Sequence, residues 1–236
     1  MPLHLRPNAP YATDLLLPGD PGRALALAQQ LLTEPKMSNH ARGLWGYTGE
    51  TPEGRRLSIQ STGMGGPSAA IVLHELADLG VKRAIRVGTC GAVDPQLQHG
   101  DLVVASDALS RDGASRALGA GESAAPDPEL TARLAAGLPA GKAPARIVST
   151  DLFYAADRGG TAEERAQAWR ELGAVAVEME AATLFALGER LGVATGCVLV
   201  VSDTFEGGTR HRIEDDALAE AVEQMGSLAA GALNPE

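Results

Sequence analysis

Two arginine-bearing glycine loops are the parts of this chain best suited to bind an anion. In residues 17–23, LPGDPGR, Gly19 precedes a proline-initiated helix and Arg23 lies in its first turn. A cation there opposes the helix dipole, so a bound anion would explain it, although a solvated arginine after an ordinary turn is also consistent. In residues 86–91, RVGTCG, Arg86 leaves an apolar strand and needs a charged partner if buried. Arg86 and Thr89 could hold a phosphate or carboxylate, or Arg86 could form a structural ion pair.

Two other segments carry groups suited to a sugar and to proton transfer. Glu178, Met179 and Glu180 stand at a strand–helix junction. Carboxylates are favoured in a first helical turn, but a carboxylate can also accept two hydrogen bonds from a sugar diol while methionine covers the sugar's apolar face. Asp203 follows the apolar run VLVVS and could protonate a leaving group.

The glycine-rich segment STGMGGPS, residues 61–68, does not have dinucleotide-binding spacing. Its glycines do not fit GxGxxG, and no acidic residue follows at the end of the next strand. The segment predicts a close approach of the backbone to a small ligand instead.

The elements that must position these residues alternate between strand and helix. Strands are predicted at 57–62, 84–87, 102–105, 146–149, 174–177 and 197–202. Helices are predicted at 20–33, from Pro67, and at 127–136, 161–172, 180–191 and 213–230. This alternation predicts an α/β fold with helices on the faces of a sheet, and the polar stretch 110–128 is expected to be an exposed loop. Ligands of such sheets bind at the carboxyl ends of the strands, where these segments lie.

Composition narrows the function classes. Twenty Lys and Arg against 30 Asp and Glu give a net charge of −10, which argues against nucleic acid as a partner. Two isolated cysteines and five histidines without ligand spacing predict neither a disulfide framework nor a metal site. The first ten residues lack a secretory apolar core and no 18-residue apolar stretch occurs, so we expect a cytoplasmic protein without a membrane partner. No linker divides the chain, so residues 1–236 are expected to form one domain.

Taken in order, these segments resemble the nucleoside phosphorylase-I family, most closely its hexameric bacterial purine nucleoside phosphorylases. The resemblance begins at His4 and covers nearly the whole chain to Asp203. It rests on LLLPGDPGRA, HARGLWGYTG, STGMGGPSAAI, RVGTCGA, STDLFY, VEMEAATL and VVSD. It implies a mixed, twisted and partly barrel-like sheet flanked by helices. It also implies phosphorolysis of purine ribo- and deoxyribonucleosides, with phosphate as co-substrate and no cofactor or metal.

The resemblance assigns roles residue by residue. Phosphate would bind Gly19, Arg23, Arg42, Arg86 and Thr89, with Arg42 supplied by a neighbouring subunit. The nucleoside would contact His4 (also from a neighbour), Met64, Phe153, Val177, Glu178, Met179 and Glu180. Asp203 would protonate the departing purine, helped by an arginine; Arg212 is our candidate, although spacing leaves Arg210 open. Sites shared in this way imply a homo-oligomer, a hexamer built as a trimer of dimers.

Three alternatives remain. Uridine phosphorylases read uracil with a glutamine and an arginine shortly after the Phe-Tyr pair, and residues 155–160, AADRGG, hold no glutamine. A nucleosidase would use water and have no need of three phosphate-binding arginines. A non-catalytic nucleoside-binding protein would keep the fold without the chemistry. The sequence does not decide between adenosine, inosine and guanosine.

Overall fold

The computed structural model describes residues 2–154, 161–206 and 209–234, where strands and helices alternate. The strands are β1 (Asp14–Leu17), β2 (Thr33–Asn39), β3 (Gly46–Glu50), β4 (Arg56–Gln60), β5 (Arg83–Ala92), β6 (Leu102–Arg111), β7 (Ser123–Ala124), β8 (Ala145–Thr150), β9 (Ala176–Glu178), β10 (Ala194–Glu206) and β11 (Thr209–Arg212). The helices are α1 (Pro21–Leu31), α2 (Gly66–Asp78), α3 (Gly113–Ala117), α4 (Pro128–Ala136), α5 (Ala162–Glu171), α6 (Ala181–Leu191) and α7 (Asp215–Ala232), with a 3-10 turn at Ala41–Gly43.

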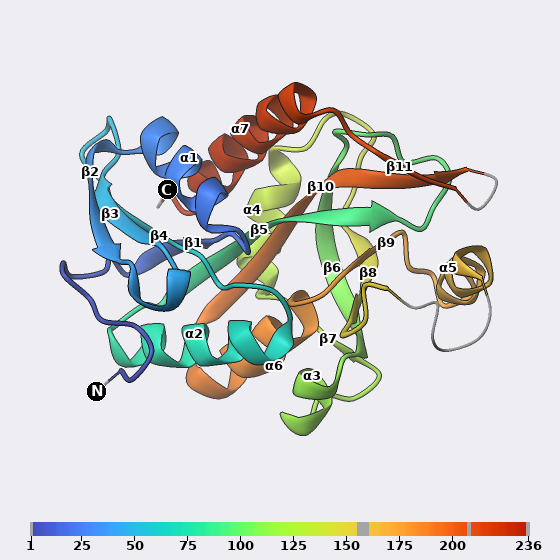
Figure 1. Cartoon of the computed structure of the whole chain (residues 1–236), viewed down its shortest axis with the longest axis horizontal. Helices are drawn as coiled ribbons and strands as arrows, with labels where there is room; N and C mark the ends of the chain where they lie inside the picture. The colour runs from blue at the N-terminus through green and yellow to red at the C-terminus, as the bar shows by residue number, and fades with distance from the viewer. Residues whose placement is uncertain (1, 155–160, 207–208, 235–236) are drawn as a thin grey trace.

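All these strands belong to one mixed sheet, part of which closes on itself. The strand order is β11-β10-β6-β8-β9-β5-β1-β4-β3-β2, with β7 beside β6. Because β10 also pairs with β5, the strands β5, β10, β6, β8 and β9 form a five-stranded barrel of parallel and antiparallel pairs. Strands β1, β4, β3 and β2 extend the sheet from β5, as Figure 1 shows, whereas β11 pairs with β10. The expected α/β fold with a partly barrel-like sheet is confirmed.

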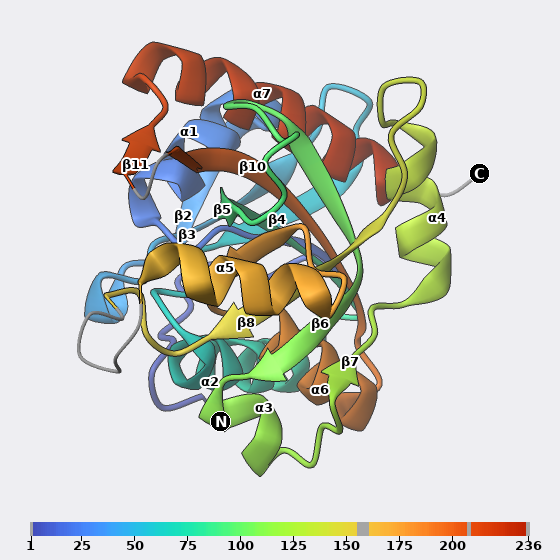
Figure 2. The same ribbon diagram turned by 90° about the vertical axis from the view of Figure 1, so that its right-hand side faces the viewer.

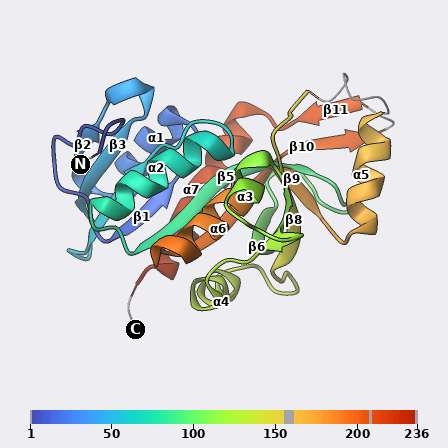
Figure 3. The same ribbon diagram turned by 90° about the horizontal axis from the view of Figure 1, so that it is seen from below.

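Helices cover the sheet on both sides. Figures 1 and 3 show α1 and α7 on one face and α2 and α6 on the other. Leu27 of α1 and Met225 of α7 belong to a buried cluster with Ile85 of β5. On the opposite face, Leu73 of α2 and Leu184 of α6 share a cluster with strand β1. Burial of these apolar faces is the main favourable contribution to folding.

The predicted helix starts are confirmed by their capping contacts. The Asp20 carboxylate accepts a hydrogen bond from the Arg23 N–H (2.7 Å), and Asp127 accepts one from the Leu130 N–H (2.9 Å). Thr161 and Glu164 form the reciprocal contacts of a capping box at the start of α5. Each cap fixes where a loop becomes a helix.

The expectation of an exposed loop at residues 110–128 is wrong in part. This stretch contains α3 and β7, and Ser110, Asp112 and Ser115 are buried. The Asp112 carboxylate accepts hydrogen bonds from the Ser115 N–H (2.8 Å) and the Thr183 hydroxyl (2.6 Å). Asp112, Ser115 and Thr183 therefore satisfy one another inside the protein, which composition alone does not reveal.

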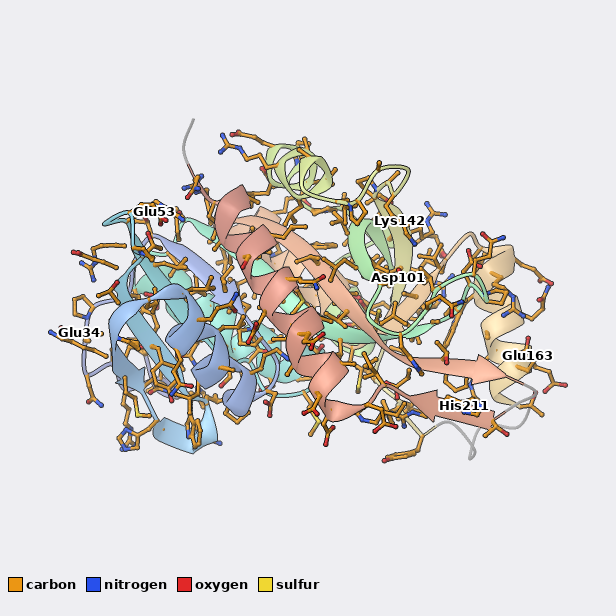
Figure 4. The ribbon with its side chains drawn as sticks, turned by 90° about the horizontal axis from the view of Figure 1, so that it is seen from above. Glu34, Glu53, Asp101, Lys142, Glu163 and His211 are labelled. Atoms are coloured by element: carbon orange, nitrogen blue, oxygen red, sulfur yellow. The ribbon has the colours of Figure 1, made fainter. Side chains whose placement is uncertain are left out.

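One end of the barrel is covered by α5 and the β10–β11 hairpin. Figure 2 views this end directly, with α5 in front. In Figure 4, Glu163 of α5 and His211 of β11 both lie at this end, opposite Glu34 and Glu53. No helix in the described residues is long and apolar enough to cross a membrane.

Two helical glycines provide a matched test of this packing. A Cβ at Gly188 in α6 would lie 2.5 Å from Thr195 Cγ2 and 2.8 Å from the Val193 carbonyl oxygen, whereas a Cβ at Gly231 in α7 would meet open space. We expect Gly188→Ala to lower the free energy of unfolding by about 1–3 kcal/mol because of overpacking. Gly231→Ala should raise it by up to about 1 kcal/mol, since alanine favours helix. Urea denaturation measures both; equal effects would contradict the packing described.

Candidate active site

A cavity of about 690 Å³ opens where the five predicted segments meet. Its walls come from the start of α1, the loop after β4, the ends of β5, β9 and β10, and helix α5. The predicted site residues that line it are Gly19, Arg23, Met64, Arg86, Thr89, Phe153, Val177, Glu178, Met179, Glu180 and Asp203. The fold thus gathers residues from distant parts of the chain at one place.

Arg86 is the buried centre of this site, with only 4% of its surface exposed. Its Nε donates to Glu178 Oε2 at 2.8 Å, and its Nη2 forms an ion pair with Glu180 Oε2. Burial by itself would lower the pKa of Arg86, but the two carboxylates outweigh it and raise the pKa, so the guanidinium stays charged. Within the described residues, Nη1 is buried without a hydrogen-bond partner.

Glu178 holds Arg86 in place and also starts helix α6. Its carboxylate accepts hydrogen bonds from the N–H groups of Glu180 (2.9 Å) and Ala181 (3.0 Å) and from the Ser149 hydroxyl. The negative charge therefore lies at the positive end of the helix dipole. Glu178 was predicted as a nucleoside contact; it lines the cavity, but its carboxylate is engaged by the protein itself.

Glu180 presents a second carboxylate to the cavity. One oxygen accepts a hydrogen bond from the Gly65 N–H at 2.5 Å, and the other pairs with Arg86. Gly65 has φ of +85°, a conformation that glycine adopts without strain and that turns its N–H toward Glu180. Burial raises the pKa of Glu180 above its ordinary value. Met179 lines the cavity beside it.

Positive charges gather at the end of the cavity where Arg23 and Arg86 lie, which we call the anion end. Burial lowers the pKa of Arg23, and although Asp20 opposes this, the nearby charges of Arg86 and Arg212 lower it further. Such mutual repulsion is relieved when an anion binds between the cations. Gly19 and Thr89 line the same cavity and offer backbone and hydroxyl donors.

Asp203 is the second centre of the site, and both of its carboxylate oxygens have partners. Oδ1 accepts hydrogen bonds from Arg210 Nε (2.8 Å) and lies 2.7 Å from Arg210 Nη2, whereas Arg212 Nη1 is 3.7 Å away. Oδ2 accepts a hydrogen bond from the Ser202 hydroxyl (2.7 Å). The sequence left open which arginine assists Asp203. The structure gives the closer contact to Arg210 rather than Arg212, although Arg212 is paired with Asp203 in the β10–β11 register.

Arg210 also connects Asp203 to the aromatic ring of Phe153. Its guanidinium carbon lies 4.6 Å from the centre of the Phe153 ring, a cation–π distance. Phe153 in turn packs edge-to-face on Tyr154, with centroids 4.9 Å apart. Residues 155–160, on which the comparison with uridine phosphorylases rested, lie outside the described residues.

His4 and Arg42 do not line the cavity of their own chain. The Glu75 carboxylate holds His4 through its ring Nδ1 (2.8 Å) and its backbone N–H (2.9 Å). Burial opposes ionisation of Glu75, but hydrogen bonds from Leu5, His4 and Leu3 lower its pKa to about 2. Arg42 is exposed in a turn with φ of +59°. Their role at a neighbouring subunit stays a prediction.

Sequence reasoning missed several cavity residues. Ser202, Phe205, Trp169 and Arg165 line the cavity, as does Arg210, which the sequence had left open as a candidate. The period-two alternation of a strand could have pointed to Phe205, two residues beyond Asp203 and on the same face. Trp169 had no such signal because α5 docks on the barrel end through tertiary contacts. In the described residues, no group of three or more His, Cys, Asp or Glu is placed to hold a metal ion.

Comparison with known proteins identifies the family of this chain. The sequence profile of the phosphorylase superfamily matches residues 13–234. The chain belongs to the phosphorylase superfamily. Among its relatives in this superfamily are proteins named purine nucleoside phosphorylase DeoD-type. That of Clostridium novyi is 38% identical over 84% of each chain, and that of Clostridium beijerinckii is 36% identical over 92% of each chain. The protein of Caldanaerobacter subterraneus is 37% identical over 86% of this chain and 88% of its own.

The buried position of Arg86 predicts a large effect of its removal. Arg86→Met leaves Glu178 and Glu180 without their cation, so we expect the free energy of unfolding to fall by about 3 kcal/mol. Arg83→Met, on the same strand, is the matched control. Arg83 is more exposed, and its partner Asp14 keeps Arg55 at 3.9 Å, so a loss of about 1 kcal/mol is expected.

Urea denaturation at pH 7 measures both variants. An Arg86→Met protein as stable as the wild type, or less affected than Arg83→Met, would contradict the role given to Arg86.

Proposed function

We propose that this chain is a purine nucleoside phosphorylase, which transfers the ribose or deoxyribose of a purine nucleoside to inorganic phosphate. The observation that carries the proposal is that Arg86, whose Nη1 is buried without a hydrogen-bond partner in the described residues, lines the cavity together with Arg23. A buried donor without a partner is costly, and a phosphate oxygen would satisfy it. The names of the superfamily relatives support the same reaction.

Phosphate would occupy the end of the cavity at Arg86. Its oxygens would accept hydrogen bonds from Arg86 and Arg23, from the Thr89 hydroxyl and from the Gly19 backbone at the start of α1. This local positive charge attracts an anion despite the net charge of −10. Arg42 of a neighbouring subunit would complete the phosphate site.

The sugar would lie between phosphate and base, against Glu180 and Met179. The Glu180 carboxylate accepts hydrogen bonds from the sugar hydroxyls, and the Met179 side chain covers the apolar face of the ring. Because Gly65 and Arg86 fix the carboxylate of Glu180, its acceptor oxygens are oriented before substrate binds.

The chemistry is a substitution at the sugar C1′. The C1′–N9 bond breaks with its electron pair going to the purine, and a phosphate oxygen forms the new bond to C1′, giving ribose 1-phosphate. Positive charge develops on the sugar, where the phosphate and Glu180 stabilise it. Asp203 donates a proton to the purine N7, so that the base leaves neutral. Arg210 stabilises the Asp203 carboxylate that remains. We expect no cofactor, because phosphate supplies the nucleophile and Asp203 the proton.

We also propose a homo-oligomer with shared sites, assembled as a hexamer of three dimers. His4 and Arg42 lie outside their own cavity, and Leu3, Met64 and Ile71 are large apolar side chains exposed on the surface. Pairing two chains would cover such side chains and bring His4 and Arg42 of one chain to the other. The two buried free thiols, Cys90 and Cys197, are consistent with a cytoplasmic protein.

A panel of nucleosides tests the reaction. Inosine, adenosine, guanosine and uridine are each incubated with and without orthophosphate, and release of free base is measured. We expect phosphate-dependent release of purine and no reaction of uridine. Purine release without phosphate would assign the chain to the nucleosidases, and turnover of uridine would overturn the purine preference.

The role of Asp203 has a matched control. Asp203→Asn keeps the shape but has no proton to transfer, so kcat should fall by about 10²–10⁴-fold. Asp101, which pairs with Lys142 at 3.1 Å outside the cavity (Figure 4), serves as control; Asp101→Asn should leave kcat within about twofold. If Asp203→Asn retains more than a tenth of the activity, Asp203 is not the proton donor.

Nucleoside binding without turnover in the unmutated protein would favour the non-catalytic alternative.

A further inference from the structure

Asp112 is a buried carboxylate that the proposed reaction does not use. Only 1% of its surface is exposed, and it stands at the start of helix α3. Its Oδ2 accepts hydrogen bonds from the Ser115 N–H (2.8 Å) and the Thr183 hydroxyl (2.6 Å), and its Oδ1 accepts one from the Ser115 hydroxyl (2.5 Å). Burial of a carboxylate is costly unless such donors compensate it. The contact with Thr183 connects α3 to α6, the helix that begins directly after Glu180.

Gly66 is the point at which helix α2 meets the same carboxylate. A Cβ at Gly66 would lie 2.5 Å from Thr183 Oγ1 and 2.9 Å from Asp112 Oδ2. Both distances are too short for a real side chain, so glycine is what allows α2 to approach α3 and α6 this closely. Figure 2 shows the three helices together on one side of the barrel. We call Gly66, Asp112, Ser115 and Thr183 the three-helix junction.

The three-helix junction lies next to the contact that orients Glu180. Gly65, which donates its N–H to Glu180 Oε1 at 2.5 Å, directly precedes Gly66. Thr183 follows Glu180 by about one helical turn. The two residues that face Asp112 are therefore close neighbours, along the chain, of the two residues that make this contact. A change in the spacing of α2 and α6 at the junction would move the Gly65 N–H relative to Glu180.

The other contacts at the start of α6 do not fix α2. The Ser149 hydroxyl accepts a hydrogen bond from the Ala182 N–H at 2.9 Å, which ties α6 to strand β8. Leu73 of α2 and Leu184 of α6 share a buried apolar cluster. Apolar burial is not directional, whereas hydrogen bonds have narrow distance and angle requirements. The Asp112–Thr183 hydrogen bond and the close approach at Gly66 therefore supply the precise alignment of α2 on α6.

We infer that Asp112 is a positioning residue for sugar recognition. Through Thr183 and Gly66 it sets the Gly65 N–H on Glu180, and thereby the selectivity for nucleosides that carry 2′- and 3′-hydroxyls. The inference rests on the proposed function, in which Glu180 accepts hydrogen bonds from these hydroxyls. Asp112 does not line the cavity, so it acts through Glu180 and not on the substrate. The bonds formed and broken in the reaction are unchanged.

A ratio of substrates tests this role. With orthophosphate, kcat/KM is measured for inosine and for 2′,3′-dideoxyinosine, which lacks both hydroxyls that Glu180 would bind. In Asp112→Asn the ratio of inosine to dideoxyinosine should fall by about tenfold, because a displaced carboxylate loses its contacts with the hydroxyls. A wild-type ratio in this variant overturns the inference.

Asp127 provides a matched control for loss of a helix cap. Its carboxylate accepts a hydrogen bond from the Leu130 N–H (2.9 Å) at the start of α4, and it does not line the cavity. Asp127→Asn should keep the wild-type substrate ratio. An equal fall in Asp127→Asn and Asp112→Asn overturns the inference. Because the readout is a ratio within one protein, a general loss of folded protein does not imitate the result.

Two further positions test the same alignment without changing the buried charge. Thr183→Val removes the hydroxyl that Asp112 accepts from, whereas Thr183→Ser retains it. Gly66→Ala places a methyl group where α2 meets Thr183 and Asp112. The substrate ratio should fall by about tenfold in Thr183→Val and in Gly66→Ala, and Thr183→Ser should restore it. A wild-type ratio in Thr183→Val or Gly66→Ala, or an equal fall in Thr183→Ser, overturns the inference even if Asp112→Asn does not fold.

Crystal structures separate this inference from the function on which it rests. Cleavage of inosine with an unchanged ratio in the variants overturns the inference and leaves the proposed function standing. If the unmutated protein cleaves no purine nucleoside, the proposed function and the sugar selectivity fail, and the structure of Thr183→Val decides the positioning of Glu180. We expect the Gly65 nitrogen to move beyond about 3.5 Å from the Glu180 carboxylate in that variant. A hydrogen bond that persists there overturns the positioning role of Asp112.

Discussion

Burial of the Arg86 guanidinium determines how the elements around it are arranged. Arg86 is buried on a barrel strand, so it must be compensated, and Glu178 and Glu180 do this from the β9–α6 junction. That junction is held against β5 by the antiparallel pairing of Gly91 with Val177. The pairing of β5 with β9 therefore closes the five-stranded barrel and also brings the two glutamates to Arg86. Arg86 and these glutamates in turn line the cavity.

The division of labour between the two glutamates follows from this constraint. The Glu178 carboxylate accepts hydrogen bonds from Arg86, Ser149 and the first N–H groups of α6, so all of these partners belong to the protein itself. Glu180 has fewer internal partners and faces the cavity. Arg86 likewise uses two of its nitrogens on carboxylates, and its Nη1 has no hydrogen-bond partner in the described residues. A chain with a net charge of −10 can in this way present a local cationic site to an anion.

Much of this could be predicted from the sequence, since local chemistry decides local structure. The capping residues Asp20 and Thr161 set the starts of α1 and α5, and the strand–glycine–helix pattern indicated which loops would meet. Features that depend on tertiary context were not accessible. The buried polar partners of Asp112 hold α3 in a stretch whose composition predicts a loop. The choice of Arg210 over Arg212 depends on the path of the β10–β11 hairpin, which spacing does not encode. The position of Trp169 in the cavity depends on how α5 docks on the barrel.

The central claim is that Arg86 Nη1 and Arg23 hold a phosphate at the end of the cavity, and a crystal structure with saturating orthophosphate tests it most directly. The predicted result is a phosphate whose oxygens accept hydrogen bonds from Nη1 of Arg86 and from the Arg23 guanidinium, with Glu178 and Glu180 still on the other nitrogens of Arg86. A phosphate bound elsewhere with the Arg86 end of the cavity free of it, or Arg86 turned away from both glutamates, would contradict the claim.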